Sequence, residues 1–175
     1  MSYIEYSSGL KFLFNLRVGE KDHFRSGTMY MEDYMDSKIR QQTINDHIQK
    51  DAFVNYLGAK VKIVNPGHSL VSLTIDKNMT NFHGTTHGGV IFAISDMAFA
   101  AACNSHGKVA VALNVSICFL KPSFPGDHLI AEAKEKHNGR RTSLYDIKIY
   151  NEKTGELVAK SQDQAYKKNK WFVQE

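Results

Sequence analysis

Hydrophobic positions recur at regular spacing along most of the chain and predict a domain with both helices and strands. Residues 1–44 show no sustained period, so we assign them to an N-terminal extension of unknown role and residues 45–175 to the folded domain. Helical spacing predicts a short helix over residues 45–57, and period-two alternation predicts six strands. The predicted strands are residues 59–64, 69–75, 109–120, 128–137, 142–151 and 156–166.

Cap and turn residues separate these elements. Asn45 or Asp46 is expected to begin the first helix, and Gly58 to end it. The pair Asn138-Gly139 is typical of a two-residue hairpin turn.

The segment from His87 to Asn104 is apolar nearly all round, which is typical of a helix buried on every side. Antiparallel strands curled around it would bury it. We therefore predict an α+β fold, in which a curved antiparallel β-sheet wraps around one long central helix. Asp96 is the only charged residue in this segment, and burying a carboxylate costs several kcal/mol unless it is partnered. It is either a satisfied core carboxylate or a functional one.

Two glycines, Gly88 and Gly89, open the same helix. Unpaired N–H groups and the helix dipole at such a position can hold an oxyanion, and glycine lets a ligand approach closely. Gly88 and Asp96 lie eight residues apart, about 12 Å along one helix, so one copy cannot place both groups on one carbonyl. Two antiparallel copies related by a two-fold axis can, so a catalytic pair predicts at least a dimer with shared sites.

Other residues in or near this helix are weaker candidates for catalysis or metal binding. Asn81 and His87 lie in and at the end of the loop that leads into this helix, and an Asn side chain can hold a water or a substrate carbonyl. His83 and His87 have the spacing of a metal pair, but no Glu and no third ligand accompany them, so we expect no metal. Ser95 lacks the residues of a nucleophile elbow, and Cys103 is expected to be an inert core residue.

Composition restricts the class of protein further. The net charge is +4, and residues 48–175 carry sixteen basic and eleven acidic side chains, which suits an anionic small ligand. No basic run is dense enough to predict nucleic-acid binding, and no apolar run is long enough to predict a membrane span. The two cysteines cannot build a disulfide framework, so we expect a reducing, cytoplasmic setting.

Several motifs together resemble the PaaI-type hotdog-fold acyl-CoA thioesterases over residues 45–166. The matching segments are Asn81-Phe-His-Gly-Thr-Thr-His87-Gly88-Gly89, Ile94-Ser95-Asp96, Asn104-Ser105, Asn114 to Pro122, Gly126-Asp127 and Gly139-Arg140.

This resemblance implies a hotdog fold whose copies pair into dimers, and dimers into a homotetramer. It implies hydrolysis of an acyl-CoA thioester, with no cofactor besides the CoA of the substrate. The family name points to phenylacetate degradation and an aryl-acetyl substrate, and short or medium acyl groups stay open.

The resemblance also implies roles for individual residues. Asp96 maps onto the carboxylate that acts as general base or nucleophile, and Gly88 onto the N–H donor of the partner subunit. Asn81 and His87 map onto residues that position the water or substrate. Some members add a Ser or Thr early in the long strand, where this chain has Val111-Ala112-Leu113.

Gly89, Lys121, Arg140 and Arg141 are the candidate substrate-binding residues, the three basic ones for the CoA phosphates. Two alternatives stay open: a non-catalytic acyl-CoA sensor on the same fold, and a hotdog dehydratase or hydratase. An intact Asp96 favours hydrolysis over the sensor, and the differently placed His and carboxylate pair of the dehydratases and hydratases is not seen in this sequence.

Overall fold

The computed structural model describes residues 31–171, of which residues 43–171 belong to one compact unit. The elements are α1 (Met31–Ile48), α2 (Ala52–Leu57), β1 (Lys60–Asn65), β2 (His68–Thr74), a 3-10 turn (Lys77–Met79), α3 (Gly88–Asn104), β3 (Lys108–Phe119), β4 (His128–Asn138), β5 (Thr142–Asn151) and β6 (Leu157–Trp171).

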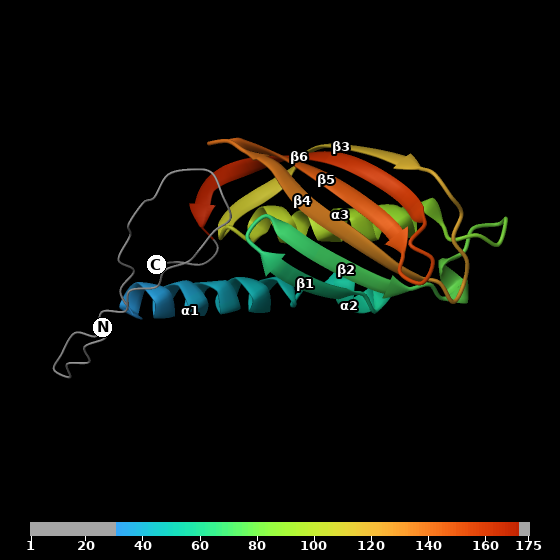
Figure 1. Cartoon of the computed structure of the whole chain (residues 1–175), viewed down its shortest axis with the longest axis horizontal. Helices are drawn as coiled ribbons and strands as arrows, with labels where there is room; N and C mark the ends of the chain where they lie inside the picture. The colour runs from blue at the N-terminus through green and yellow to red at the C-terminus, as the bar shows by residue number, and fades with distance from the viewer. Residues whose placement is uncertain (1–30, 172–175) are drawn as a thin grey trace, which may run out of the picture. The chain divides into compact units, whose positions relative to one another are not determined.

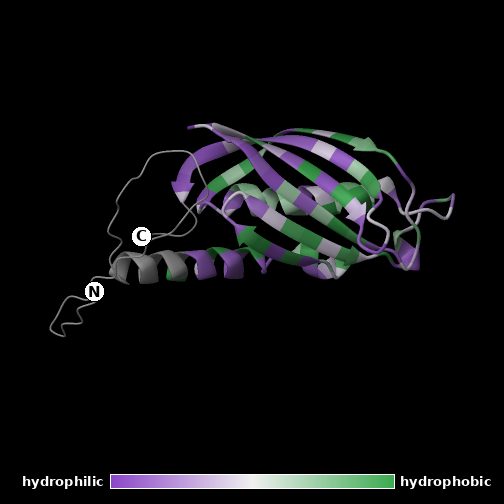
Figure 2. Cartoon of the chain, viewed as in Figure 1, coloured by the Kyte–Doolittle hydropathy of each residue, from purple (hydrophilic) through white to green (hydrophobic). Residues whose placement is uncertain are grey.

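The six strands form one antiparallel sheet in the order β1-β2-β4-β5-β6-β3, which curves over α3 (Figure 1). Hydrophobic and hydrophilic residues alternate along the strands (Figure 2), and the apolar side packs against α3. Phe99 of α3 and Tyr145 of β5 meet edge to face, with ring centroids 5.4 Å apart. The predicted α+β fold, a curved sheet around one long helix, is confirmed.

The first predicted helix is wrong in its start. The chain forms α1 up to Ile48 and then a separate α2, because Asp51 caps the second helix. Its Oδ1 accepts hydrogen bonds from the backbone N–H groups of Phe53 and Val54 at 2.8 and 3.1 Å. Gly58 ends α2 in the left-handed region, as predicted. α1 begins within the segment assigned to the extension, and residues 1–30 lie outside the described residues.

The prediction that the long helix is buried on every side is also wrong. Nine of the 17 residues of α3 are buried, but Phe92 is 40% exposed and Ala100 is exposed. The single sheet covers only one side of α3, which leaves an open stripe. We define the open stripe as Gly89, Ala93, Asp96, Ala100 and Asn104, which recur at helical spacing and are partly or fully exposed.

A second apolar surface lies along β3. This strand is an edge of the sheet, paired only with β6 among the strands of residues 31–171. Val111, Leu113 and Phe119 on it are 39%, 59% and 53% exposed. An apolar edge strand with a free row of backbone groups is a template for pairing with another chain.

The turn between β4 and β5 is not the two-residue hairpin turn that Asn138-Gly139 predicts. β4 ends at Asn138 and β5 begins at Thr142, so three residues connect them instead of two. The N–H of Gly139 donates to the Thr142 carbonyl at 2.9 Å. Lys167 Nζ donates to the side chain of Asn138 and to the Gly139 carbonyl, which holds the wider turn in place.

Candidate functional site

The loop before α3 is built around Asn81. Its Oδ1 accepts from the N–H groups of His83 and Thr85 at 2.9 and 3.3 Å, and its Nδ2 donates to the Thr85 hydroxyl at 2.9 Å. The Thr86 N–H and hydroxyl bond to Ser123, which anchors the loop to the connection between β3 and β4. Asn81 therefore shapes the loop, and its side chain keeps only one N–H for a water or substrate.

His87 caps the N-terminus of α3. Its Nδ1 accepts the N–H of Gly89 at 2.9 Å, so that nitrogen is unprotonated and the neutral ring carries its proton on Nε2. The Gly89 N–H is thus already engaged. No hydrogen bond within residues 31–171 uses the N–H of Gly88, which leaves it free to bind an oxyanion in the field of the helix dipole.

Asp96 lies two turns further along α3, on the open stripe and partly exposed. Burial raises the pKa of its carboxyl group, and the charge of Asp51 at the start of α2 raises it further. A carboxylate with a raised pKa is a stronger base for proton removal from water. Gly88 is about 12 Å away along the same helix, so the two groups still cannot meet on one carbonyl within one protomer.

A second carboxyl group, Asp163, lies behind the helix. It is on β6, fully buried, and was not singled out from the sequence. Burial raises its pKa to about 6; the Ser161 hydroxyl, which bonds to Oδ1, lowers the value and the charge of Asp96 raises it. Its Oδ2 has no hydrogen-bond partner within the described residues. The alternation of Ala159, Ser161 and Asp163 with polar residues was the available signal for an inward-facing acid.

A cavity of about 400 Å³ opens beside the C-terminal half of α3. Its α3 wall consists of Met97, Ala100, Ala101 and Asn104, and Val54 and Val61 line the other side. Asp51 and Lys50 lie at the same cavity. It therefore offers mostly apolar walls within one or two turns of Asp96.

The three basic residues expected to bind the CoA phosphates do not lie together in one protomer. Lys121 lies two residues before Ser123, which bonds to the loop at the N-terminal end of α3. The Nζ of Lys121 forms an ion pair with Glu156. Arg140 and Arg141 are exposed in the β4–β5 turn near the C-terminal end of α3. Two copies with antiparallel helices would bring opposite ends of α3 together.

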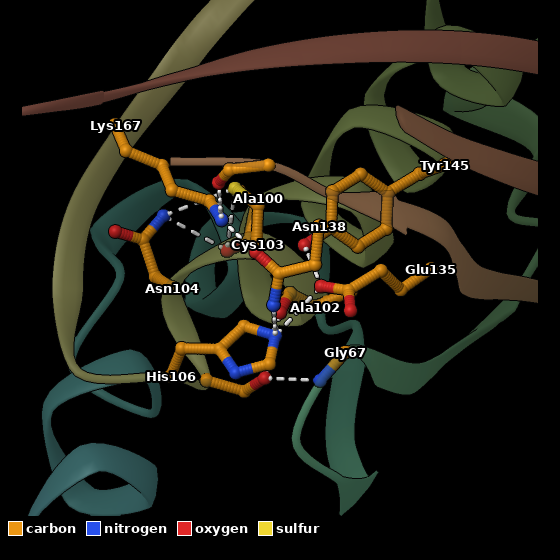
Figure 3. Close-up of polar contacts among 12 residues, drawn as sticks. Gly67, Ala100, Ala102, Cys103, Asn104, His106, Glu135, Asn138, Tyr145 and Lys167 are labelled. Atoms are coloured by element: carbon orange, nitrogen blue, oxygen red, sulfur yellow. Dashed lines mark hydrogen bonds and ion pairs between the residues drawn. The ribbon is translucent and has the colours of Figure 1, made fainter. Parts of the chain in front are cut away.

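A polar network fixes that C-terminal end (Figure 3). Glu135 Oε2 accepts from the Tyr145 hydroxyl at 2.8 Å and lies 2.7 Å from Nε2 of His106. The Ser105 hydroxyl donates to the Ala102 carbonyl at 2.6 Å and accepts the Gly67 N–H at 2.7 Å. These contacts tie the end of α3 to β4, to β5 and to the turn between β1 and β2.

Other nucleophiles are poorly placed. Ser95 is buried, and its hydroxyl has no hydrogen-bond partner within residues 31–171, so no base activates it. Burial raises the pKa of the Cys103 thiol to about 12, with the Asp96 charge adding to the effect. No group of three or more His, Cys, Asp or Glu side chains in the described part of the chain is arranged to hold a metal ion.

The fold and the site define a class of protein. A sheet curved over one helix leaves a carboxyl group midway along that helix and a free N–H at its N-terminus, with the open stripe of α3 and the apolar edge of β3 uncovered. This arrangement suits attack of water on an acyl carbonyl at an interface between two copies.

Comparison with known proteins agrees with this class. The Thioesterase superfamily model matches residues 83–158. The acyl-coenzyme A thioesterase PaaI of Escherichia coli is 42% identical over 104 residues, which cover 59% of this chain and 74% of that protein.

Solved structures match over more of the chain. The E. coli PaaI structure has a TM-score of 0.72 and 36% identity, and the match covers 77% of this chain and 97% of that one. A Streptococcus mutans protein bound to acetyl-CoA has a TM-score of 0.61 and 29% identity, over 65% and 90% of the two chains. The chain belongs to the thioesterase superfamily, and its fold is the PaaI-type hotdog fold.

Proposed function

We propose that the protein hydrolyses acyl-CoA thioesters to the free acid and CoA, with Asp96 of one protomer and Gly88 of its partner at each site. The observation that carries the proposal is the pairing of a base on the open stripe with a free N–H at the helix N-terminus. Relatives named acyl-CoA thioesterases and a related structure bound to acetyl-CoA support the substrate class.

In the proposed reaction, Asp96 removes a proton from a water molecule whose oxygen attacks the thioester carbonyl. The Gly88 N–H of the partner stabilises the negative charge that develops on the carbonyl oxygen. The C–S bond then breaks, and the proton held by Asp96 passes to the leaving CoA sulfur. His87 holds the turn around Gly88, and Asn81 holds the preceding loop.

The same geometry supports a dimer. The open stripe of α3 and the exposed apolar residues of the β3 edge are surfaces that a second copy would cover. Pairing of two such dimers would give the tetramer that the resemblance implies. In the dimer, Arg140 and Arg141 of one copy approach the Gly88 end of the other and are our candidates for contact with the CoA phosphates.

The acyl group is proposed to occupy the cavity beside α3, whose apolar walls accept an aryl-acetyl or a short or medium acyl chain. We propose no cofactor beyond the CoA of the substrate, no nucleic-acid partner and a cytoplasmic location. None of the helices between residues 31 and 171 is long and apolar enough to cross a bilayer.

The test is a screen of aryl, short-chain and long-chain CoA esters with detection of the free thiol. Wild type should release CoA from at least one class. Asp96→Asn, which keeps the shape of the side chain, should lose turnover and keep the fold. Tight binding of acyl-CoA without release by wild type would instead identify a sensor.

A labelling experiment with the same enzyme and substrate tests whether Asp96 acts as a general base or as a nucleophile. A general base leaves its own oxygens unchanged, whereas a nucleophile forms an acyl-aspartate, and water that attacks the aspartyl carbonyl of this intermediate introduces solvent oxygen into the side chain. Single turnover in ¹⁸O-water followed by peptide mass spectrometry tests this: the proposal expects no label in Asp96, and label in Asp96 would show an acyl-aspartate.

A further inference from the structure

The turn between β4 and β5 carries two arginines whose charges are not paired. Arg140 and Arg141 are exposed, and no hydrogen bond or ion pair within residues 31–171 engages either guanidinium group. A guanidinium group stays charged and offers several N–H donors in a planar fork, which suits phosphate oxygens. The side chains of this turn are therefore available to an anion, and the position of the turn decides where they are presented.

The backbone of the same turn is held from β6 by one residue. Lys167 Nζ donates to the Gly139 carbonyl at 2.8 Å and to the side-chain oxygen of Asn138 (Figure 3). The backbone N–H of Lys167 donates to the Arg141 carbonyl at 2.8 Å. Lys167 thus binds both the first and the last residue of the three-residue connection.

Lys167 is a rigid support for the turn. Its strand, β6, pairs with β5 on one side and with β3 on the other, where Lys167 lies opposite Ala110. Its side chain is partly buried, and burial lowers the pKa of the ammonium group, although the charge of Glu135 raises it. Within residues 31–171 the only hydrogen-bond partners of this ammonium group are the two oxygen atoms of the turn. The cost of burying the charge is therefore offset by contacts with the turn.

The side chain of Asn138 depends on Lys167 for its position. Its Nδ2 lies 3.4 Å from Nε2 of His106, but this nitrogen is also 2.7 Å from Oε2 of Glu135. An Nε2–H that donates to the Glu135 carboxylate cannot accept from Asn138. The bond from Lys167 is then the contact that holds the Asn138 side chain at the end of β4.

We propose that Lys167 is a positioning residue for CoA binding: by holding the β4–β5 turn, it keeps Arg140 and Arg141 in place for the phosphate groups of the substrate. This rests on the proposed function, in which the two arginines contact CoA. A turn that is already ordered does not have to be ordered when the ligand binds, so the free energy of binding is not reduced by that cost. Lys167 acts through the turn and does not itself contact CoA.

The first test measures KM and kcat for an acyl-CoA in wild type and two variants that lose the same charge. Lys167→Met removes both side-chain bonds to the turn and should raise KM about five-fold, the factor that corresponds to about one hydrogen bond. Its kcat should change little, because the turn carries no reacting group. Lys168→Met is the matched control, since Lys168 is exposed and its side chain has no hydrogen bond or ion pair within the described residues. It should keep the wild-type KM.

Two comparisons separate positioning from direct contact. The pantetheine thioester of the same acid lacks the phosphate groups, so K167M should leave its KM unchanged. In a protein that already carries Arg140→Ala and Arg141→Ala, K167M should raise KM for acyl-CoA no further. The same five-fold rise in that background, or with the pantetheine thioester, would overturn the inference.

Hydrogen exchange of the turn gives a readout that needs no activity. The Gly139 N–H is bonded to the Thr142 carbonyl, and its exchange should be on the order of ten-fold faster in K167M and unchanged in K168M. Equal exchange in K167M and wild type would overturn the inference. If K167M does not fold, Asn138→Ala removes one acceptor of Lys167 from an exposed residue and should shift exchange and KM in the same direction; no shift would again overturn it.

Failure of the proposed function gives a different result. A wild type that binds CoA in calorimetry but releases none from any acyl-CoA would reject hydrolysis, and the affinity for CoA then replaces KM in each comparison above. A wild type that hydrolyses acyl-CoA while K167M keeps its KM and its Gly139 exchange would reject the role of Lys167 alone.

Discussion

Replacing Gly88 by proline removes one hydrogen-bond donor from the proposed site with little other change. Gly88 is the first residue of α3, a position where proline is tolerated because that N–H has no partner within the helix. The preceding residue, His87, has φ −62° and ψ 131°, the extended conformation that a following proline requires. A Cβ at this position would lie 3.5 Å from the Phe119 ring, an ordinary contact.

The expected loss follows from the role of the N–H. Removing one donor from an oxyanion site lowers kcat by about 10²–10³-fold, or about 3 to 4 kcal/mol of transition-state stabilisation. KM should change little, because the developing charge exists mainly in the transition state. Gly88→Ala is the matched control, because it adds the same Cβ and keeps the N–H, so its loss should be far smaller.

The assay is steady-state release of CoA thiol by wild type, G88P and G88A, with thermal unfolding of each protein as the check on folding. Equal loss in G88P and G88A would show that crowding against Phe119, and not the N–H, matters. Full activity in G88P with an intact fold would refute the assignment of the Gly88 N–H as the oxyanion donor.

Two further predictions concern stability and CoA binding. Asp163 binds its proton more tightly in the folded protein, with a pKa of about 6, than in an unfolded chain, with the ordinary value of 3.8. Wild-type stability should therefore fall by about 3 kcal/mol as pH rises from about 3 to about 7, and Asp163→Asn should lose this dependence in chemical denaturation; parallel curves would contradict it. Replacing Arg140 and Arg141 together by Ala should raise KM for acyl-CoA several-fold and make KM less dependent on salt. Lys121→Ala should raise KM less, because Lys121 is paired with Glu156. An unchanged KM in the double variant would exclude the arginines from CoA binding.

Much of the fold could be predicted from the sequence, because in most elements the hydrophobic pattern along the chain agrees with the packing in the structure. The predicted boundaries of β5 are those of the structure, and α3 begins one residue after its predicted start. The first helix and the β4–β5 turn were wrong because single side chains decided them. Asp51 supplies a cap that begins a new helix, and Lys167, distant in sequence, holds the three-residue turn.

The candidate site was predictable only in part, because some of its residues stand out in the sequence and others gain their meaning from packing. Asp96 and Gly88 stand out because each is unusual in an apolar helix, and their spacing predicts two copies if both act on one carbonyl. Asp163 was missed because its significance depends on which strand faces α3, and sequence alternation does not show that. Gly89 differs again: only the structure shows that its N–H is already bonded to His87.

The sharing of each site between two protomers is tested most directly by mixing two inactive variants. Asp96→Asn and Gly88→Pro would be co-expressed with different tags, and the mixed dimers isolated. In a mixed dimer one site carries both substitutions and the other carries neither, so the mixed dimers should recover about half of wild-type turnover per dimer. Activity no higher than that of either variant alone would contradict a site built from the Asp96 of one copy and the Gly88 of the other.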